Sequence, residues 1–235
     1  MTKPIALLLS CEHAVNTVPD KYIDLFNGQE NVLQTHRGID FGALAIANHL
    51  HQTFHCDFIQ AHASRLLIDC NRSLGHSHCF SEFTKHLSSQ DKQDLINEYY
   101  LPFRQQTEQL IKSHIEQGFQ ILHLSIHSFT PELNGIKRNA GIGILYDHAR
   151  HGEQEVARIW RSLLLQQTPT YRVRMNYPYH GNTDGFTTTL RKTYTEHDYI
   201  GFEVESNQAL LADKTSLNEV ANALSSSLQE LMQLL

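Results

Sequence analysis

Residues 121–128 read Ile-Leu-His-Leu-Ser-Ile-His-Ser, and their apolar positions run almost without interruption. Such a run is typical of a strand that is buried on both faces of a sheet, and it predicts that His127 lies at a strand end. A second apolar run, residues 5–10, leads into His13 in the same way. Because ligands bind outside the carboxyl ends of strands in open α/β sheets, two histidines at such ends indicate a metal site.

The length and charge of the chain limit what it can be. Its 235 residues are enough for one large α/β domain and short for two separate cores, so we expect a single catalytic domain over residues 1–235. A net charge of −6 without any basic block argues against a nucleic-acid partner. The apolar run at residues 5–10 is too short for a signal peptide or a membrane span, which predicts a cytoplasmic protein with no membrane partner. The sequence does not indicate an oligomeric state.

The cysteines show no CxxC spacing, so we expect reduced thiols rather than disulfides or a structural zinc site. They are Cys11, Cys56, Cys70 and Cys79. Cys11 stands beside Glu12 and His13, which raises a thiol nucleophile as an alternative chemistry. Catalytic triads are assembled across space, so this adjacency is a weak signal.

Periodicity assigns most of the remaining chain. Strands are predicted at residues 56–60, 65–70, 141–146, 171–175 (an edge strand) and 199–204, and helices at residues 20–27, 88–117, 153–167 and 217–234 and from residue 40 onward. Pro102 should kink or split the second of these helices. Residues 75–87 and 130–139 are predicted loops, the first lying over the site, and residues 187–194 have no clear assignment.

The segment at residues 64–73, Ser-Arg-Leu-Leu-Ile-Asp-Cys-Asn-Arg-Ser, encloses an apolar centre between charged groups. Buried charges need partners, so one interpretation is that Asp69 neutralises an arginine. The other is an anion clamp, in which Arg72 binds a carboxylate through its planar fork and Asn71 donates to the same group.

Two later segments offer further polar groups. The turn-rich loop at residues 176–185 contains Tyr179, His180 and Asn182, which either face a ligand or belong to a plain connection. In the last predicted strand, period-two alternation places Glu203 and Glu205 on one face.

These strand ends supply the parts of a hydrolytic zinc site. Such a site takes three ligands from His, Asp and Glu, lowers the pKa of a bound water to about 7, and uses a nearby carboxylate to carry protons. His13 and His127 are the candidate nitrogen ligands. Glu12 and Asp40 are further oxygen donors, although Asp40 is equally placed to cap the helix that follows it.

Several motifs carry a family resemblance when they are taken in chain order. They are Ser10-Cys-Glu-His-Ala14, Val18-Pro19, His36-Arg-Gly-Ile-Asp-Phe-Gly42, Ser64-Arg-Leu-Leu-Ile-Asp-Cys-Asn-Arg72, Ser125-Ile-His-Ser128, Asn176-Tyr-Pro-Tyr179 and Phe202-Glu-Val204. In this order they resemble the N-formylglutamate amidohydrolase family over nearly the whole chain. The resemblance implies a zinc-exopeptidase-like fold with three α/β/α layers and a mixed, mostly parallel sheet.

The resemblance also implies roles for individual residues. His13, Asp40 and His127 would be the metal ligands, with Glu12 as the alternative to Asp40. Carboxypeptidase-like relatives place a glutamate where this chain has Asn16, a poor zinc ligand. Glu203 would carry protons, Arg65 would polarise the scissile carbonyl, and Asn71 and Arg72 would hold the substrate carboxylate. From the turn-rich loop, we expect Tyr179 and Asn182 to contact the substrate.

The sequence therefore predicts a zinc-dependent amidohydrolase of a small N-acyl amino acid, with N-formyl-L-glutamate as the leading substrate. The same ligand set also suits manganese, iron or cobalt. A side-chain carboxylate on the substrate would need a second cation, for which Arg138, Lys137 and Arg191 are candidates. The alternatives are another zinc amidase or carboxypeptidase, acting on a different N-acyl amino acid or a peptidoglycan fragment, and a non-catalytic protein that binds metal or anions.

Overall fold

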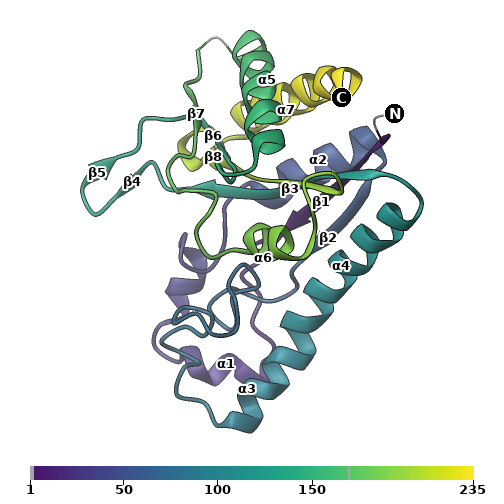
Figure 1. Ribbon diagram of the computed structural model, residues 1–235. Helices are drawn as coiled ribbons and strands as arrows, with labels where there is room; N and C mark the ends of the chain where they lie inside the picture. The colour runs from purple at the N-terminus through teal and green to yellow at the C-terminus, as the bar shows by residue number, and fades with distance from the viewer. Residues whose placement is uncertain (1–2, 169) are drawn as a thin grey trace.

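The chain folds around a mixed sheet, and the computed structural model describes residues 3–168 and 170–235 (Figure 1). Its strands are β1 (Ile5–Cys11), β2 (Asp57–Gln60), β3 (Gln120–Phe129), β6 (Ile142–Leu145), β7 (Val173–Met175) and β8 (Tyr199–Asn207). Their order across the sheet is β2, β1, β3, β8, β6, β7. The strands from β2 to β8 run parallel, β6 is antiparallel to β8, and β7 is parallel to β6. The mostly parallel, mixed sheet predicted from the sequence is confirmed.

The predicted central strand is β3, which lies between β1 and β8 and is buried from Ile121 to Phe129. It runs two residues past His127, since its pairing with β8 extends from Ile121 opposite Tyr199 to Phe129 opposite Asn207. A strand that is covered on both faces can be apolar at nearly every position, which explains the uninterrupted run in the sequence.

Helices cover both faces of the sheet (Figure 1). One face carries α2 (Ala43–Phe54), α5 (His151–Gln167) and α7 (Lys214–Leu234), and the other carries α1 (Asp20–Ile23), α3 (Ser89–Leu95), α4 (Leu101–Glu116) and α6 (Phe186–Thr193). Side chains that alternate along β1 point to the two faces of the sheet in turn, so they contribute to both hydrophobic clusters. Leu7 and Leu9 pack in the cluster with α2, α5 and α7, whereas Leu8 packs in the cluster with α3, α4 and α6. The predicted three-layer α/β/α class is therefore confirmed.

On the face that α4 and α6 cover, the strands change from apolar to polar toward their carboxyl ends. In β3, Ile121 lies in the apolar cluster, and the residues that follow at period two are His123, Ser125 and His127. In β8, Glu203 and Glu205 lie on this face as predicted, and both line one cleft. The change in polarity places the site at the carboxyl ends of these strands.

The long predicted helix at residues 88–117 is split, as Pro102 suggested. The Ser88 hydroxyl accepts from the Asp91 N–H at 3.1 Å and caps α3, and a π-turn over Ile96–Tyr100 then leads into α4. Pro102 lies at the start of α4, directly after the π-turn, so its missing N–H coincides with the interruption of the regular α-helical pattern. The predicted helix at residues 20–27 is shorter, because α1 continues into a 3-10 turn at Asp24–Phe26.

The prediction of a strand at residues 65–70 is wrong, because this segment is a succession of turns. Its backbone groups find partners outside any sheet: the N–H of Asp69 donates to the Cys79 carbonyl at 2.8 Å, and Thr84 Oγ1 donates to the Leu67 carbonyl at 2.9 Å. The apolar residues that suggested a strand are buried in the cluster with α3, α4 and α6. Their burial thus comes from tertiary packing.

Three other segments depart from expectation. The helix predicted from Asp40 begins at Ala43 after Gly42, whose φ is 78°, so Asp40 is not its N-cap. The predicted loop at residues 130–139 contains the hairpin strands β4 (Glu132–Leu133) and β5 (Ile136–Lys137), joined by an Asn-Gly pair with both φ positive. Residues 187–194, which had no assignment, lie almost entirely in α6.

Two further 3-10 turns lie at Glu30–Gln34 and Gln208–Leu210.

A buried ion pair joins α5 to α6. Glu153 is 0% exposed, and its oxygens accept from Arg191 Nε at 2.9 and 3.0 Å. Arg191 also donates to the carbonyls of Gly181 and Gly201. Arg150 Nε lies 3.5 Å from the same carboxylate, so Glu153 is the counter-charge of two arginines. It connects α5 with α6, on the opposite face of the sheet, and through Arg191 with β8.

Glu153→Gln should destabilise the protein by about 3–5 kcal/mol, because it leaves the Arg191 guanidinium buried without a counter-charge. Urea denaturation followed by far-UV circular dichroism measures this change. The matched control is Glu155→Gln on the exposed side of the same helix, which should stay within about 0.5 kcal/mol of the parent. Equal midpoints for both variants would contradict the assignment.

Candidate active site

A cleft of about 830 Å³ opens at the carboxyl ends of β1, β3 and β8. Its floor consists of polar side chains from these strand ends and from the turns beside them, and its walls come from residues 77–85, the segment beside the β4–β5 hairpin, and residues 178–183. This volume lies in the range of sites that hold small molecules. The cleft is where the topology of an open α/β sheet is expected to bind a ligand.

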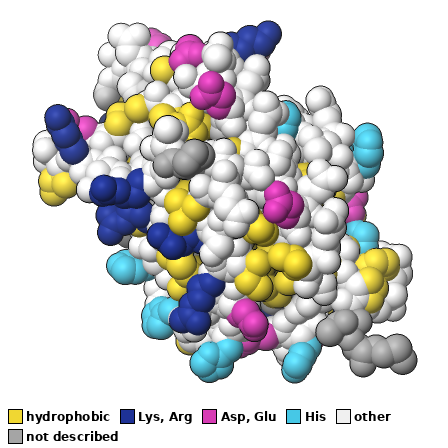
Figure 2. Space-filling model, turned by 90° about the horizontal axis from the view of Figure 1, so that it is seen from above, with side chains coloured by type: hydrophobic (Ala, Val, Ile, Leu, Met, Phe, Trp, Pro, Cys, Tyr) yellow, Lys and Arg dark blue, Asp and Glu magenta, His cyan; other side chains and the backbone are white. Residues whose placement is uncertain are grey.

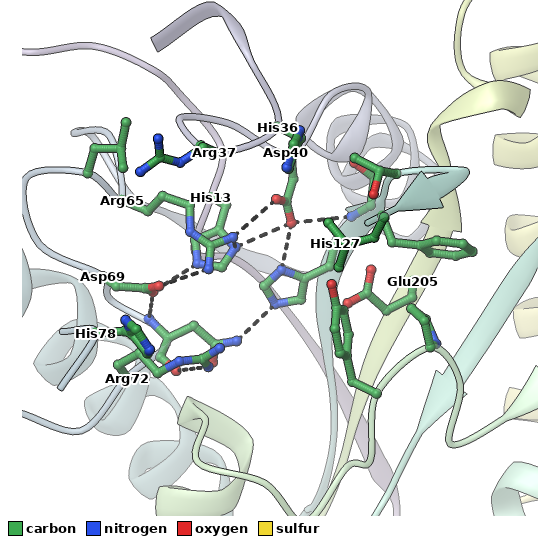
Figure 3. Close-up of a pocket in the computed structure, with 18 of the residues that line it drawn as sticks. His13, His36, Arg37, Asp40, Arg65, Asp69, Arg72, His78, His127 and Glu205 are labelled. Atoms are coloured by element: carbon green, nitrogen blue, oxygen red, sulfur yellow. Dashed lines mark hydrogen bonds and ion pairs between the residues drawn. The ribbon is translucent and has the colours of Figure 1, made fainter. Parts of the chain in front are cut away.

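The structure brings together three residues that the sequence analysis proposed as metal ligands (Figure 3). Asp40 Oδ2 lies 2.9 Å from His127 Nδ1 and 3.3 Å from His13 Nδ1, and all three side chains are buried. They come from the end of β3, the turn before α2, and the residues after β1. The backbone N–H of Asp40 donates to the His13 carbonyl at 3.1 Å, which fixes the turn against the strand end.

The far nitrogen of each histidine faces a carboxylate. His13 Nε2 lies 2.8 Å from Asp69 Oδ1, and His127 Nε2 lies 2.8 Å from Ser125 Oγ and 3.3 Å from Glu12 Oε2. A carboxylate behind an imidazole favours a proton on the near nitrogen and leaves the other nitrogen as a lone-pair donor. Both Nδ1 atoms face Asp40.

The charges of this cluster require a cation or protons at its centre. Burial alone would raise the pKa of Asp40, but the two histidines hold it well below its usual range, so the carboxyl is ionised. Burial would lower the pKa of His127, but hydrogen bonds to Asp40 and Glu12 raise it well above the ordinary value. Two imidazoles and one carboxylate that converge in this way form a donor set that fits a divalent metal.

Glu12, the alternative oxygen ligand, lies behind the cluster rather than in it. Ser10 donates to its Oε1 and Ser125 to its Oε2, each at 2.7 Å. Burial would raise the pKa of Glu12, but these hydrogen bonds and His127 bring it to about 2. Asn16 also lies away from the cluster, since its amide donates to the Leu33 carbonyl. Asp40 is thus the carboxylate that joins the two histidines.

Arg65 lies directly beside the candidate metal ligands. Its Nη2 donates to Asp69 Oδ2 at 2.9 Å, and its Nη1 lies 3.1 Å from His13 Nδ1 and 3.5 Å from Asp40 Oδ1. Asp69 therefore neutralises an arginine, as one interpretation held, and also contacts His13. The guanidinium provides a positive charge at the edge of the cluster.

Asn71 and Arg72 follow in a turn whose Asp69 carboxylate accepts from the Asn71 N–H at 2.9 Å. Asn71 Nδ2 lies 3.4 Å from Glu203 Oε1, and its Oδ1 accepts from the Phe186 N–H at 2.7 Å. Arg72 Nη1 donates to the carbonyls of Asn71 and Asp184, at 3.0 and 2.8 Å. Both side chains line the cleft next to Glu203.

The two glutamates of β8 differ in their surroundings. Glu203 Oε1 accepts from Thr187 Oγ1 at 3.3 Å, and Gly185 leaves room for it, since a Cβ there would lie 2.8 Å from this oxygen. Glu205 is buried, and its Oε2 has no hydrogen-bond partner among the described residues. Burial raises the pKa of Glu205 to about 8. Figure 3 shows Glu205 on the side of His127 opposite to Arg65 and Asp69.

The remaining candidate substrate-binding residues differ in whether they line the cleft. Tyr179 lines the cleft, and its hydroxyl accepts from Arg138 Nη2 at 3.1 Å, whereas Asn182 is exposed and lies outside the cleft lining. Arg138 lines the cleft, Lys137 is exposed on the hairpin, and Arg191 is bound to Glu153. Asn182, which was expected to contact the substrate, and Arg191, one of the three candidate cations, therefore both lie outside the cleft lining.

Sequence reasoning missed several residues of the cleft wall, among them His36, Arg37, His78 and Lys85. Figure 2 shows Lys and Arg gathered on the left of the molecule, the side on which Figure 1 places β4, β5 and β7. The signals in the sequence were the high number of histidines, 16 in 235 residues, and the motif at residues 36–42, which begins with His36 and Arg37. Arg37 is paired with Glu82, which also lines the cleft, so Lys85 and Arg138 are the wall cations that can attract an anionic ligand.

Cys11 does not serve as a nucleophile in this cleft. Its side chain is 0% exposed and packs in the cluster with α2, α5 and α7, on the other face of the sheet. Burial raises the pKa of this thiol well above its ordinary value. All four cysteines are free, as predicted.

The structure thus defines an open α/β protein with a polar cleft at its strand ends, and the family follows from the sequence. Residues 5–212 match the family model of N-formylglutamate amidohydrolase. The chain belongs to the N-formylglutamate amidohydrolase family and is an amide hydrolase.

Two solved structures resemble the chain along nearly its whole length. The gene product Atu2144 from Agrobacterium tumefaciens has a TM-score of 0.82 and 28% identity, covering 97% of this chain and 90% of that one. N-formylglutamate amidohydrolase from Ralstonia eutropha JMP134 has a TM-score of 0.71 and 15% identity, covering 99% and 96%. No curated protein matches the chain in sequence. Among the described helices, none combines the length and the apolar character needed to cross a bilayer.

Proposed function

We propose that the protein is a metal-dependent amidohydrolase that removes the acyl group from a small N-acyl amino acid, and that N-formyl-L-glutamate is its leading substrate. The products are formate and L-glutamate. The observation that carries this proposal is the convergence of His13, Asp40 and His127 in the same cleft as Arg72 and Glu203. Membership of the family supports the choice of an amide as the bond that is cleaved.

His13, Asp40 and His127 would hold the metal, and zinc is the first candidate. Manganese, iron and cobalt accept the same ligands. A divalent ion bound there supplies Lewis-acid polarisation of the scissile carbonyl and lowers the pKa of water to about 7. The carboxylates behind both imidazoles, Asp69 and Glu12, support this role because such partners orient metal-binding histidines.

Arg72, helped by Asn71, binds the α-carboxylate of the substrate. A guanidinium forms paired hydrogen bonds with a carboxylate, and Arg72 lines the cleft near the cluster. Anchoring this end holds the amide in place, so that attack on it becomes effectively intramolecular. Arg65, beside His13 and Asp40, donates to the carbonyl oxygen as negative charge develops on it.

Glu203 is the proton carrier. It removes a proton from the attacking water and returns one to the departing amine. Its carboxylate accepts only long contacts from Asn71 and Thr187, at 3.4 and 3.3 Å, so its oxygens are available to a substrate. Glu205 lies two residues further along the same face of β8, so its substitution is the matched control for a substitution of Glu203.

The whole proposal is tested by measuring metal content and amine release on one preparation. Protein purified without chelator should contain about one divalent metal per chain and should release glutamate from N-formyl-L-glutamate. Removing the metal should abolish turnover, and zinc should restore it. Faster release from other N-acyl amino acids or peptidoglycan fragments would favour a different zinc amidase, and metal binding without any turnover would favour a binding protein.

Glu203→Gln should lower kcat by at least ~10²-fold and leave metal content unchanged, because the amide cannot carry the proton. Glu205→Gln, the same change on the same strand face, should lower kcat clearly less. Steady-state kinetics with N-formyl-L-glutamate measure both variants. Full activity of the Glu203 variant, or equal losses in both, would remove the assignment of the proton carrier to Glu203.

Arg138 is the cation that we assign to a side-chain carboxylate of the substrate. Its guanidinium lies 5.0 Å from the Tyr179 ring centroid and 5.9 Å from that of Phe129. Nη1 donates to Thr130 Oγ1 and Nη2 to the Tyr179 hydroxyl, and no carboxylate pairs with it among the described residues. A cation held in this way retains its charge for a ligand.

Arg138→Gln should raise KM for N-formyl-L-glutamate by ~10- to 100-fold, as the loss of a charged hydrogen bond predicts. The KM for N-formyl-L-norvaline, which has no side-chain carboxylate, should not change. Lys137→Gln on the exposed hairpin is the matched control and should behave as the parent with both substrates. Equal effects of Arg138→Gln on the two substrates would contradict this role.

A further inference from the structure

A chain of buried polar side chains runs beneath the cleft, across β1, β3 and β8. His123 Nδ1 lies 2.7 Å from the Tyr199 hydroxyl, and His123 Nε2 lies 2.8 Å from Ser10 Oγ. Ser10 contacts one oxygen of Glu12, and Ser125 contacts the other, each at 2.7 Å. Ser125 also lies 2.8 Å from His127 Nε2, which connects the chain to the candidate metal cluster. The members are at most 2% exposed.

The contacts of 2.7 and 2.8 Å set one arrangement of protons. Asn71 Nδ2 also lies 3.5 Å from His127 Nε2, a longer contact from an amide that faces Glu203 Oε1 at 3.4 Å. An ionised carboxylate only accepts, so both serine hydroxyls donate their single hydrogen to Glu12. Each serine oxygen must then accept from its other neighbour, which makes His123 and His127 donate from Nε2. His123 Nδ1 is left as an acceptor, and the Tyr199 hydroxyl donates to it. Every hydrogen bond in the chain therefore points toward the Glu12 carboxylate.

This arrangement decides which nitrogen of His127 is offered to the metal. The proton on Nε2 is held by Ser125, whereas the proton on Nδ1 is shared with Asp40 at 2.9 Å and is the one that a bound metal would replace. At His13, Asp69 contacts the ring directly and also binds Arg65, so its charge is shared. Glu12 has no arginine or lysine partner among the described residues, and its short hydrogen bonds come from the two serines.

We infer that Glu12 is a positioning residue that fixes the tautomer of His127 through Ser125. The inference rests on the proposed metal site and adds a residue that holds one of its ligands ready for the ion. The charge of Glu12 is essential, because a glutamine amide would present a donor to one of the serines. That serine would have to reverse its hydrogen bond, and a reversed Ser125 would favour a proton on His127 Nδ1. His123 and Tyr199 satisfy Ser10 but do not determine the state of His127.

The test compares zinc affinity in four proteins by competition with a chromophoric chelator. Glu12→Gln should bind zinc ~10- to 100-fold more weakly than the parent, the usual effect of losing the partner of a ligating histidine. Ser125→Ala should also bind more weakly, because it removes the 2.8 Å contact with His127 Nε2 and leaves only the 3.3 Å contact of Glu12 Oε2 with that atom. Tyr199→Phe removes the far donor without reversing any bond and should bind zinc as the parent does.

A second measurement determines which ring nitrogen of His127 carries the proton. Long-range ¹H–¹⁵N spectra of the zinc-loaded parent should show His127 protonated at Nε2 and not at Nδ1. Circular dichroism establishes that each variant is folded, and if Glu12→Gln does not fold, Ser125→Ala carries the test. Unchanged zinc affinity in the Glu12 and Ser125 variants would overturn the inference, as would an equal loss in Tyr199→Phe. A parent protein that binds no zinc or other divalent ion would overturn the proposed metal site itself.

Discussion

The parallel pairing of β3 with β8 decides which side chains share the floor of the cleft. Its register places Ser125 opposite Glu203 and His127 opposite Glu205. A slip of one residue would turn these groups toward α2, α5 and α7 and bring apolar residues to the cleft. The residues between them, Leu124, Ile126, Phe202 and Val204, are buried in that helical layer. The hydrophobic pattern that builds the core therefore also sets the positions of the polar groups.

The parts of the structure that follow from local pattern were predictable. Apolar runs in residues 5–10, 121–128 and 199–204 mark strands that the sheet buries, and helical spacing marks α5 and α7. Parallel strands end at the same edge, so the sequence alone brought His13, His127 and Glu203 near one another. Local pattern offered Asp40 both as an oxygen donor and as a helix cap, and the family resemblance favoured Asp40 over Glu12 as the third ligand.

The parts that depend on contacts between distant segments were not predictable in the same way. Leu66, Leu67 and Ile68 look like a strand because they are buried, but they pack in the cluster with α3, α4 and α6 as part of a turn. Nothing local distinguishes Arg138, which lines the cleft, from Arg191, which a helix-to-helix ion pair holds. The position of Glu12 behind His127 depends on two serines from different strands. The Asn-Gly turn of the β4–β5 hairpin was a local signal that the loop interpretation overlooked.

The cleft floor and the cleft wall come from different kinds of structure. The floor is made by strand ends and by turns bonded to them, whereas the wall is made largely by the segments around residues 77–85, the hairpin and residues 178–183. Loops accept insertion and exchange more readily than buried strands do. Selectivity for the amide substrate can thus diverge during evolution without disturbing the cleft floor, and redesign of the loops alone offers a route to amide hydrolases of altered specificity.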